Sequence, residues 1–244
     1  MKKTIFTLAL MLCSLIAMAD VYTYSWTGKL GDNINFRLDL QESTFGTLIG
    51  EVTYFRKNGK VAKIPAYGYI LNYEGQDECS YILNEYNGTK VCGTFFFEIK
   101  DGKPVGTWNL LDKELEINNV LGCDDPETDE IDFFNPATSA NATGNYEFSY
   151  SRGNGLEDCG GSCSLKVIGG KINWEMTQVT PNIAEGNGTS NFNNGYFTGK
   201  VSNFEFEAYV DKKFIYVKRT DNSGPVDDWG MAATIEGIYV RVKN

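Results

Sequence analysis

Apolar residues at every second position are the feature that most constrains how this chain can fold. The stretches 35–40, 95–100 and 204–208 each alternate between two sets of side chains, as NFRLDL does at 35–40. This period is typical of antiparallel strands that turn one face to a core and the other to water. Turn dipeptides that tolerate positive φ angles separate the runs, at Asn58-Gly59, Asn87-Gly88 and Asp101-Gly102. With no sustained helical period after residue 19, the sequence predicts an all-β fold of antiparallel hairpins.

The predicted strands fall into two groups, at 20–120 and 144–244. The stretch between them, 121–143, is rich in Asp, Glu, Pro, Ser, Thr and Asn, a composition that suits a linker or long loop. We therefore predict two domains, each a small barrel or sandwich.

Residues 1–19 have the layout of a secretory signal peptide. Lys2 and Lys3 precede a short apolar run, and Ala17-Met18-Ala19 supplies small residues before a cleavage point. The run is short for a membrane span, which needs about 20 residues, and the bulky Leu12 disfavours lipoprotein processing at Cys13. We expect a mature chain from Asp20 that is exported, periplasmic or extracellular, without a transmembrane helix.

Charge and residue usage exclude several function classes. The chain has 22 basic and 32 acidic residues, a net charge of −10, and such a chain repels nucleic acids and anionic membrane surfaces. It contains no histidine, which removes Ser-His-Asp and Cys-His catalysis and histidine-containing zinc sites. We expect a protein that is not an enzyme.

Five cysteines follow the predicted cleavage point, and an odd number leaves at least one thiol free or intermolecular. Cys159 and Cys163 enclose a flexible Gly-Gly-Ser and are the predicted disulfide pair. For Cys79 and Cys92, a turn centred on Asn87-Gly88 would place Cys92 opposite Leu83. The two thiols would then lie about 13 Å apart along the strands, beyond the roughly 7 Å Cα limit for a bridge.

Aromatic residues supply the candidate ligand contacts. Several tyrosines lie close together across one hairpin region, and we predict ligand contacts at Tyr67, Tyr69, Tyr81 and Tyr86. The alternative is ordinary packing, because β domains use aromatic rings for both purposes. Phe95 and Phe97 are expected in the core. Phe96 shares the opposite face with Glu98 and is a further predicted contact, whereas Trp108 is predicted to plug a barrel.

Six carboxylates crowd into the stretch 124–132, and Ca²⁺ binds such oxygen-rich loops. The predicted ligands are Asp124, Asp125, Asp129 and Asp132. The spacing lacks the EF-hand pattern, so a solvated acidic loop is the alternative, and no other cofactor is predicted.

A hairpin pattern in the first half resembles one in exported proteins of Gram-negative bacteria. It comprises Gly50-x-Val52-x-Tyr54, Asn58-Gly59-Lys60, Leu83-x-Glu85, Gly93-x-Phe95 and Gly106-Thr107-Trp108. The second half, from NYEFSYS to GIYVRV, is similar to small calycin-type or avidin-type barrels, such as bacterial lysozyme inhibitors, in which the last strand closes on the first. This resemblance implies a closed or nearly closed barrel that binds something in or near its mouth, but a fold does not identify the ligand.

A second resemblance concerns Glu130-Ile131-Asp132-Phe133, which is similar to the Glu-x-Asp-x-x-Glu strand of laminarinase-like glycoside hydrolases. It implies a nucleophile at Glu130 and an orienting acid at Asp132, because a retaining mechanism needs two carboxyl groups about 5–5.5 Å apart. The acid/base position is Asn135, which cannot donate a proton as an acid.

The sequence therefore predicts an exported, non-enzymatic binding protein of the cell envelope whose partner is a small molecule, a glycan or a protein. One alternative is inhibition of a lysozyme or protease, since an acidic protein is steered to basic targets. The other is a glycoside hydrolase that uses carboxylates alone.

Overall fold

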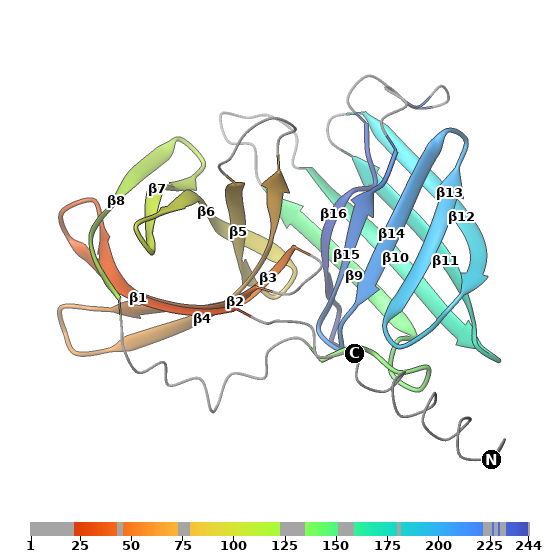
Figure 1. The fold of residues 1–244 in the computed structure, drawn as a ribbon, viewed down its shortest axis with the longest axis horizontal. Coiled ribbons are helices and arrows are strands. Elements are labelled where there is room, and N and C mark those ends of the chain that lie inside the picture. The colour runs from red at the N-terminus through yellow and green to blue at the C-terminus, as the bar shows by residue number, and fades with distance from the viewer. Residues whose placement is uncertain are drawn as a thin grey trace, which may run out of the picture.

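The computed structural model describes residues 22–42, 46–72, 79–122, 135–150, 159–179, 182–221, 226, 229 and 233–243. Sixteen β strands and no helix lie within these ranges, which confirms the predicted all-β class. The strands form two curved groups that stand side by side (Figure 1). Among these residues, no helix is long and apolar enough to cross a membrane.

The first barrel consists of the first eight strands. Each strand pairs antiparallel with the next, and β8 pairs with β1, which closes the cylinder. The strands are β1 (Tyr22–Leu30), β2 (Ile34–Glu42), β3 (Thr47–Phe55), β4 (Val61–Asn72), β5 (Cys79–Asn87), β6 (Lys90–Lys100), β7 (Lys103–Leu110) and β8 (Lys113–Gly122).

The second barrel consists of the last eight strands. They are β9 (Gly144–Tyr150), β10 (Cys159–Ile168), β11 (Lys171–Val179), β12 (Ile183–Asn191), β13 (Tyr196–Val201), β14 (Phe204–Val210), β15 (Phe214–Arg219) and β16 (Gly237–Arg241). The last strand pairs with the first, at Val240–Glu147 and Arg241–Tyr146. Between β12 and β13 the described residues form no strand ladder, and the Ser190 hydroxyl donates to the Thr198 carbonyl there, at 2.5 Å.

Alternation along the strands sets which side chains enter each barrel. In β11, Ile172, Trp174 and Met176 are buried while the residues between them are exposed, as the period of two requires. In β6, Phe95 and Phe97 are buried and Phe96 is 42% exposed, which confirms the predicted faces of this strand.

The hairpin between β5 and β6 has a different turn from the one predicted. Asn87 pairs with Lys90, so the two turn residues are Gly88 and Thr89, and Gly88 takes the positive φ of 64°. A register shift follows beside Glu85 and Tyr86, so Leu83 faces Phe95 rather than Cys92. A β-bulge of this kind inserts a residue that simple pairing arithmetic cannot anticipate.

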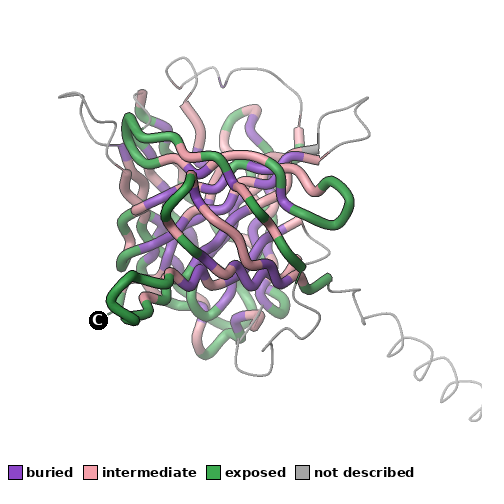
Figure 2. Tube along the Cα trace, turned by 90° about the vertical axis from the view of Figure 1, so that its left-hand side faces the viewer, coloured by how far each residue is buried: buried purple, intermediate pink, exposed green. Residues whose placement is uncertain are grey.

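Buried side chains pack the interiors of both barrels, and Figure 2 marks the buried residues along the chain in purple. The core of the first barrel includes Trp26, Phe36, Leu83, Phe95, Phe97 and Trp108. The core of the second includes Tyr146, Leu165, Trp174, Met176, Phe206 and Tyr239. Trp108 is thus a buried core residue, as predicted.

The stretch 135–143, predicted as the end of a linker, is packed onto the second barrel. Ala137 and Ala142 are fully buried in that barrel's core, and the Ala137 amide donates to the Val210 carbonyl at 2.8 Å. Arg241 donates to the carbonyls of Asn141 and Thr143. Small buried side chains, a backbone bond and the Arg241 side chain hold the segment against the barrel core.

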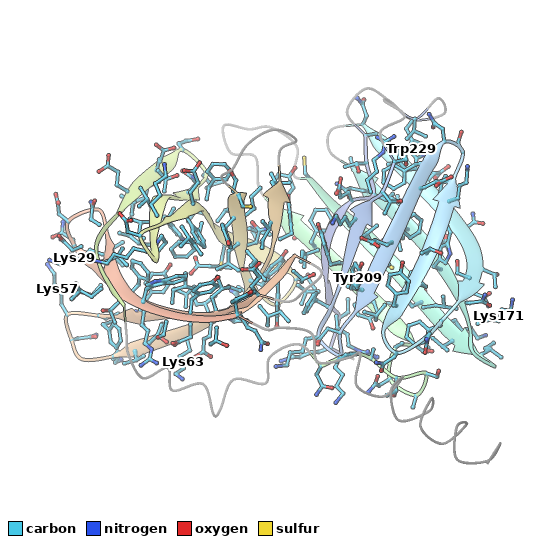
Figure 3. All side chains as sticks on the ribbon, in the orientation of Figure 1. Lys29, Lys57, Lys63, Lys171, Tyr209 and Trp229 are labelled. Atoms are coloured by element: carbon cyan, nitrogen blue, oxygen red, sulfur yellow. The ribbon has the colours of Figure 1, made fainter. Side chains whose placement is uncertain are left out.

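The two barrels meet through an aromatic interface. It contains Ile49, Tyr67, Tyr86, Tyr209, Phe214, Tyr216, Ile238 and Val240. Tyr67 stacks on Phe214 with ring centroids 4.8 Å apart, and Tyr69 stacks on Tyr216 at 5.6 Å. Figure 3 shows Tyr209 on the side of the second barrel toward the first, with Lys171 at the opposite edge.

The predicted Cys159–Cys163 disulfide is absent, and both thiols are free. The two residues lie on the same extended strand, β10, where four residues span about 13 Å. The Gly-Gly-Ser between them continues the strand instead of forming a loop. Cys79 and Cys92 are also free.

Candidate ligand cleft between the two barrels

An open cleft of about 770 Å³ lies beside the aromatic interface, with walls from both barrels. The first barrel contributes Tyr69, Ile82, Asn84, Tyr86, Lys90, Val91, Cys92, Gly93, Thr94, Asn109, Leu110 and Leu111. The second barrel contributes Phe148, Tyr150, Gln178, Glu236, Gly237 and Ile238. The size is within the range of ligand sites, about 300–1,000 Å³.

The first-barrel wall carries two parallel rows of side chains across neighbouring strands. The apolar row runs from Tyr69 to Ile82 to Phe96, which are direct cross-strand partners. The polar row runs from Asn84 to Thr94 to Asn109, also direct partners. Alternation places both rows on the outer face, since Leu83 and Phe95 between them point into the core.

Hydrogen bonds hold the polar row in place. The Thr94 hydroxyl donates to Asn84 Oδ1 at 2.8 Å, and Asn109 Nδ2 donates to the Thr107 hydroxyl at 3.1 Å. Amide and hydroxyl groups offer both donors and acceptors. The row is therefore an uncharged hydrogen-bonding strip next to an apolar one.

The second-barrel wall is an aromatic pair on β9. The rings of Phe148 and Tyr150 are stacked with centroids 6.3 Å apart and an interplanar angle of 7°, and Phe148 also packs edge-on against Tyr239 at 5.1 Å. Gly161 makes room for this arrangement, because a Cβ there would lie 2.7 Å from the Phe148 ring.

The turn between β7 and β8 adds an exposed apolar element to the cleft. Leu111 is 57% exposed and has a positive φ of 53°, a conformation that non-glycine residues adopt infrequently. Leu110 beside it is also exposed. Exposed leucines at the rim of an aromatic cleft extend its apolar surface.

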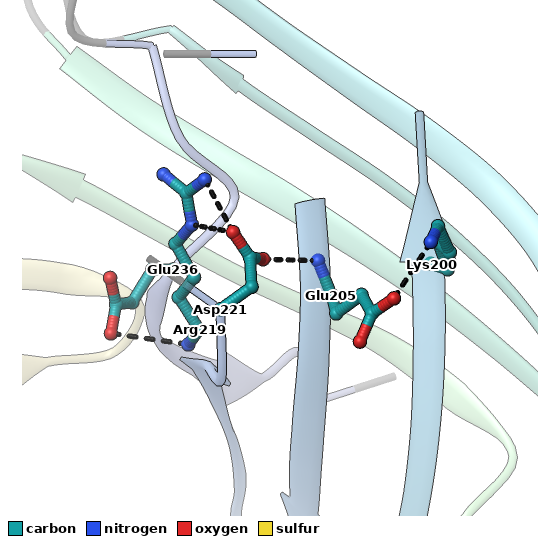
Figure 4. A network of polar contacts seen from close by, with 5 residues as sticks. All are labelled: Lys200, Glu205, Arg219, Asp221 and Glu236. Carbon is teal, nitrogen blue, oxygen red and sulfur yellow. Dashed lines mark hydrogen bonds and ion pairs between the residues drawn. The ribbon is translucent and has the colours of Figure 1, made fainter. Parts of the chain in front are cut away.

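Charge is sparse around the cleft. Lys90 is an exposed residue at its edge, and Glu236 is a half-buried carboxyl whose pKa is raised by desolvation. Figure 4 shows how Glu236 accepts a bond from the Arg219 amide at 3.3 Å. The Arg219 guanidinium is in turn paired with Asp221 at 2.8 Å.

Cys92 is the one thiol among the lining residues that the structure describes. Burial, and secondarily the nearby Glu85 carboxylate, raises the pKa of this thiol above its ordinary value. The thiolate is the nucleophilic form of cysteine. Cys92 therefore lacks the lowered pKa that a nucleophilic cysteine requires.

A buried carboxyl lies on the core side of the cleft wall. Glu85 is 1% exposed and accepts hydrogen bonds from the Tyr54 hydroxyl at 2.6 Å and from Trp108 Nε1 at 2.8 Å. Desolvation raises its pKa. Alternation along β5 could have predicted this burial, because Glu85 lies on the same face of the strand as the core residue Leu83.

The structure separates the five predicted ligand residues. Tyr69 and Tyr86 line the cleft, and Phe96 continues the apolar row beyond it. Tyr67 is 6% exposed and is covered by the second barrel. Tyr81 is buried against Phe97 in the first barrel, with centroids 5.2 Å apart. The sequence could not separate these residues, because their exposure depends on how the two barrels pack together.

The predicted calcium ligands Asp124, Asp125, Asp129 and Asp132 lie outside the described residues, as does Glu130. Asn135 is described, and its amide donates to Asp211 Oδ2 at 2.6 Å. Within the described ranges, no group of three or more histidine, cysteine, aspartate or glutamate residues has the arrangement of a metal site.

Comparison with known proteins does not assign a family. No family model and no curated protein matches the chain. A solved structure that is similar is a protein of unknown function from the DUF3598 family of Nostoc punctiforme PCC 73102. It is 10% identical with a TM-score of 0.30, over 86% of this chain and 82% of that one, a likeness that carries no weight for function.

Proposed function

We propose that this protein is an exported, non-enzymatic binding protein that holds its ligand in the cleft between its two barrels. The observation that carries the proposal is the contrast between the two kinds of space. Side chains fill both barrel interiors, whereas the cleft is open and lined by residues of both barrels. Apolar walls with a few placed polar groups are typical of binding sites. The calycin-type likeness stays part of this proposal, with the ligand in the cleft, where Phe148 and Gln178 lie on the same strand faces as the second-barrel core residues Tyr146 and Met176.

The chemistry of the cleft supports binding without turnover. The chain has no histidine, and the pKa of Cys92 is raised instead of lowered. Among the described lining residues, Glu236 supplies one carboxyl, whereas glycoside hydrolysis generally uses a pair. The hydrolase alternative rests on Glu130 and Asp132, which lie outside the described residues, so it stays a prediction from sequence.

Cys92 provides a test that does not require the ligand class to be known. In a variant with Cys13, Cys79 and Cys123 replaced by serine, Cys92 is the partly exposed thiol, while Cys159 and Cys163 are buried. Alkylation by iodoacetamide is measured by mass spectrometry with libraries of oligosaccharides, lipids, peptides and nucleotides. We expect one class to slow alkylation of Cys92 and to be recovered chemically unchanged.

The matched control is the reciprocal variant, in which Cys79 is retained and Cys92 becomes serine. Cys79 begins β5 and is not in the cleft lining, so the same ligand should leave its alkylation rate unchanged. The proposal is refuted if no class protects Cys92, or if the protecting compound is converted to product.

Inhibition of a basic enzyme is the second candidate function. Filled barrels favour recognition through the outer surface, and the net charge of −10 would steer the protein toward a basic partner. Micromolar protein should then lower the activity of a basic lysozyme or protease, and full residual activity across a panel of such enzymes would exclude this function.

A further inference from the structure

We infer that the ligand of the inter-barrel cleft is a neutral oligosaccharide, seated between the aromatic pair of β9 and the polar row of the first barrel. This inference rests on the proposed binding function and adds the chemical class of the ligand. Four features of the cleft support it: its charge, its facing polar and aromatic walls, its backbone pairing and its openness.

The sparse charge disfavours ionic ligands. Among the described residues of the lining, Lys90 is the single lysine, and partial burial raises the pKa of Glu236. A polyanion needs clustered Lys and Arg to replace its counterions, and the acidic chain as a whole repels it. A polycation would need several ionised carboxylates, and the described residues of the lining include one carboxyl, that of Glu236.

The polar row and the aromatic pair of β9 match the hydroxyls and the C–H face of a sugar ring. Each sugar hydroxyl both donates and accepts, as do the amides and hydroxyl of Asn84, Thr94 and Asn109. The C–H face of a ring packs on apolar and aromatic surface, which Phe148 and Tyr150 supply from the opposite wall. A sugar held between the walls would place its hydroxyls against the polar row and its C–H face against the aromatic pair.

Backbone pairing in the first-barrel wall disfavours an extended peptide added to that wall. Peptides commonly bind by adding a strand to a free sheet edge. In this wall β5 pairs with β4 and β6, β6 pairs with β5 and β7, and β7 pairs with β6 and β8. These strands offer no such edge to the cleft.

Openness and polarity disfavour a lipid. An acyl chain laid in the cleft would cover Asn84, Thr94 and Asn109 without giving them hydrogen bonds. Burying polar groups in this way is unfavourable. The apolar spaces that would suit such a chain, the barrel interiors, are occupied by side chains.

The test measures binding of defined oligosaccharides to the full protein by calorimetry. The neutral probes are hexasaccharides of glucose, xylose, mannose and N-acetylglucosamine, and the charged probes are oligogalacturonate and heparin oligosaccharides. We expect a neutral probe to bind and to slow the alkylation of Cys92. Tyr150→Ala should weaken that binding about tenfold through loss of ring packing, and Asn109→Ala roughly threefold to tenfold through loss of one hydrogen bond.

Two exposed residues elsewhere serve as matched controls. Tyr22→Ala removes an exposed ring on β1, and Asn35→Ala removes an exposed amide on β2. Both substitutions should leave the affinity unchanged. Circular dichroism spectra of all four variants would be compared with the wild type to check that they fold.

The outcomes separate this inference from the proposed function. If lipids, peptides or charged oligosaccharides alone protect Cys92, the cleft is a binding site and the sugar assignment is wrong. If a neutral sugar binds but neither protects Cys92 nor responds to Tyr150→Ala, the assignment to this cleft is wrong. If nothing protects Cys92, both proposals fail.

Discussion

The buried carboxyl of Glu85 contributes to the stability of the first barrel because it accepts two hydrogen bonds there. Replacing it by alanine leaves the Tyr54 hydroxyl and Trp108 Nε1 without the acceptor they have at 2.6 and 2.8 Å. An unsatisfied buried polar group costs about 1–3 kcal/mol. For two such groups, partly offset by removal of the desolvated carboxyl, we expect Glu85→Ala to lower the free energy of unfolding by about 2–5 kcal/mol.

Glu85→Gln keeps an acceptor oxygen for Trp108 but removes the titration. Because burial raises the pKa of Glu85 in the folded protein, its contribution to stability is present at low pH and is lost as the pH rises through the raised pKa. The wild type should therefore lose stability relative to Glu85→Gln as the pH rises above the ordinary glutamate range. Glu42, Asp211 and Glu236 also have raised pKa values, but they are common to both proteins and cancel in the difference.

Urea unfolding followed by tryptophan fluorescence, at steps between about pH 4 and pH 8, measures both effects. The control is Glu98→Gln, on the outer face of β6, where the carboxylate pairs with Lys100 at 2.8 Å. An exposed pair contributes little, so this variant should follow the wild-type curve. Parallel curves for wild type and Glu85→Gln, or an alanine variant as stable as the glutamine one, would refute the reasoning.

Three further outcomes are expected. Tyr67→Ala should lower the free energy of unfolding by about 3–5 kcal/mol, because it removes a ring buried between the barrels, whereas Tyr67→Phe keeps the ring and should cost less than about 1.5 kcal/mol; equal losses in denaturant titrations would contradict this. A peptide holding Cys159 and Cys163 should have the same mass before and after reduction, and a mass increase on reduction would show a bridge. Protein recovered from the medium or periplasm should begin at Asp20 by N-terminal sequencing, while an intact Met1 in the cytoplasm would contradict export.

Much of the fold follows from local patterns in the sequence. Alternation assigned Phe95 and Phe97 to the core and Phe96 to the outer face, because successive side chains of a strand point to opposite sides. The same rule applies along β11. The hairpin turn was misplaced by one residue. The β-bulge beside Glu85 then shifts the pairing by one more, and a bulge depends on how two strands pair and not on either strand alone.

The cleft was less accessible to sequence reasoning. Tyr67, Tyr69, Tyr81 and Tyr86 form one group in the sequence, yet the structure divides them among the interface, the cleft and a barrel core. Their different environments arise from the second barrel, whose Phe214 and Tyr216 are more than a hundred residues away. Phe148 and Tyr150, which form the opposite wall, had no local pattern that marked them as part of a site.

The sequence by itself determined the all-β class and the side of the sheet on which the phenylalanines of β6 lie, because side-chain periodicity and turn chemistry act over a few residues. The tertiary structure decided that the barrels are filled, that Cys159 and Cys163 lie too far apart to bridge, and that an open cleft lies between the barrels. These properties depend on which distant surfaces meet, and contacts of that kind have no signature in the local order of residues.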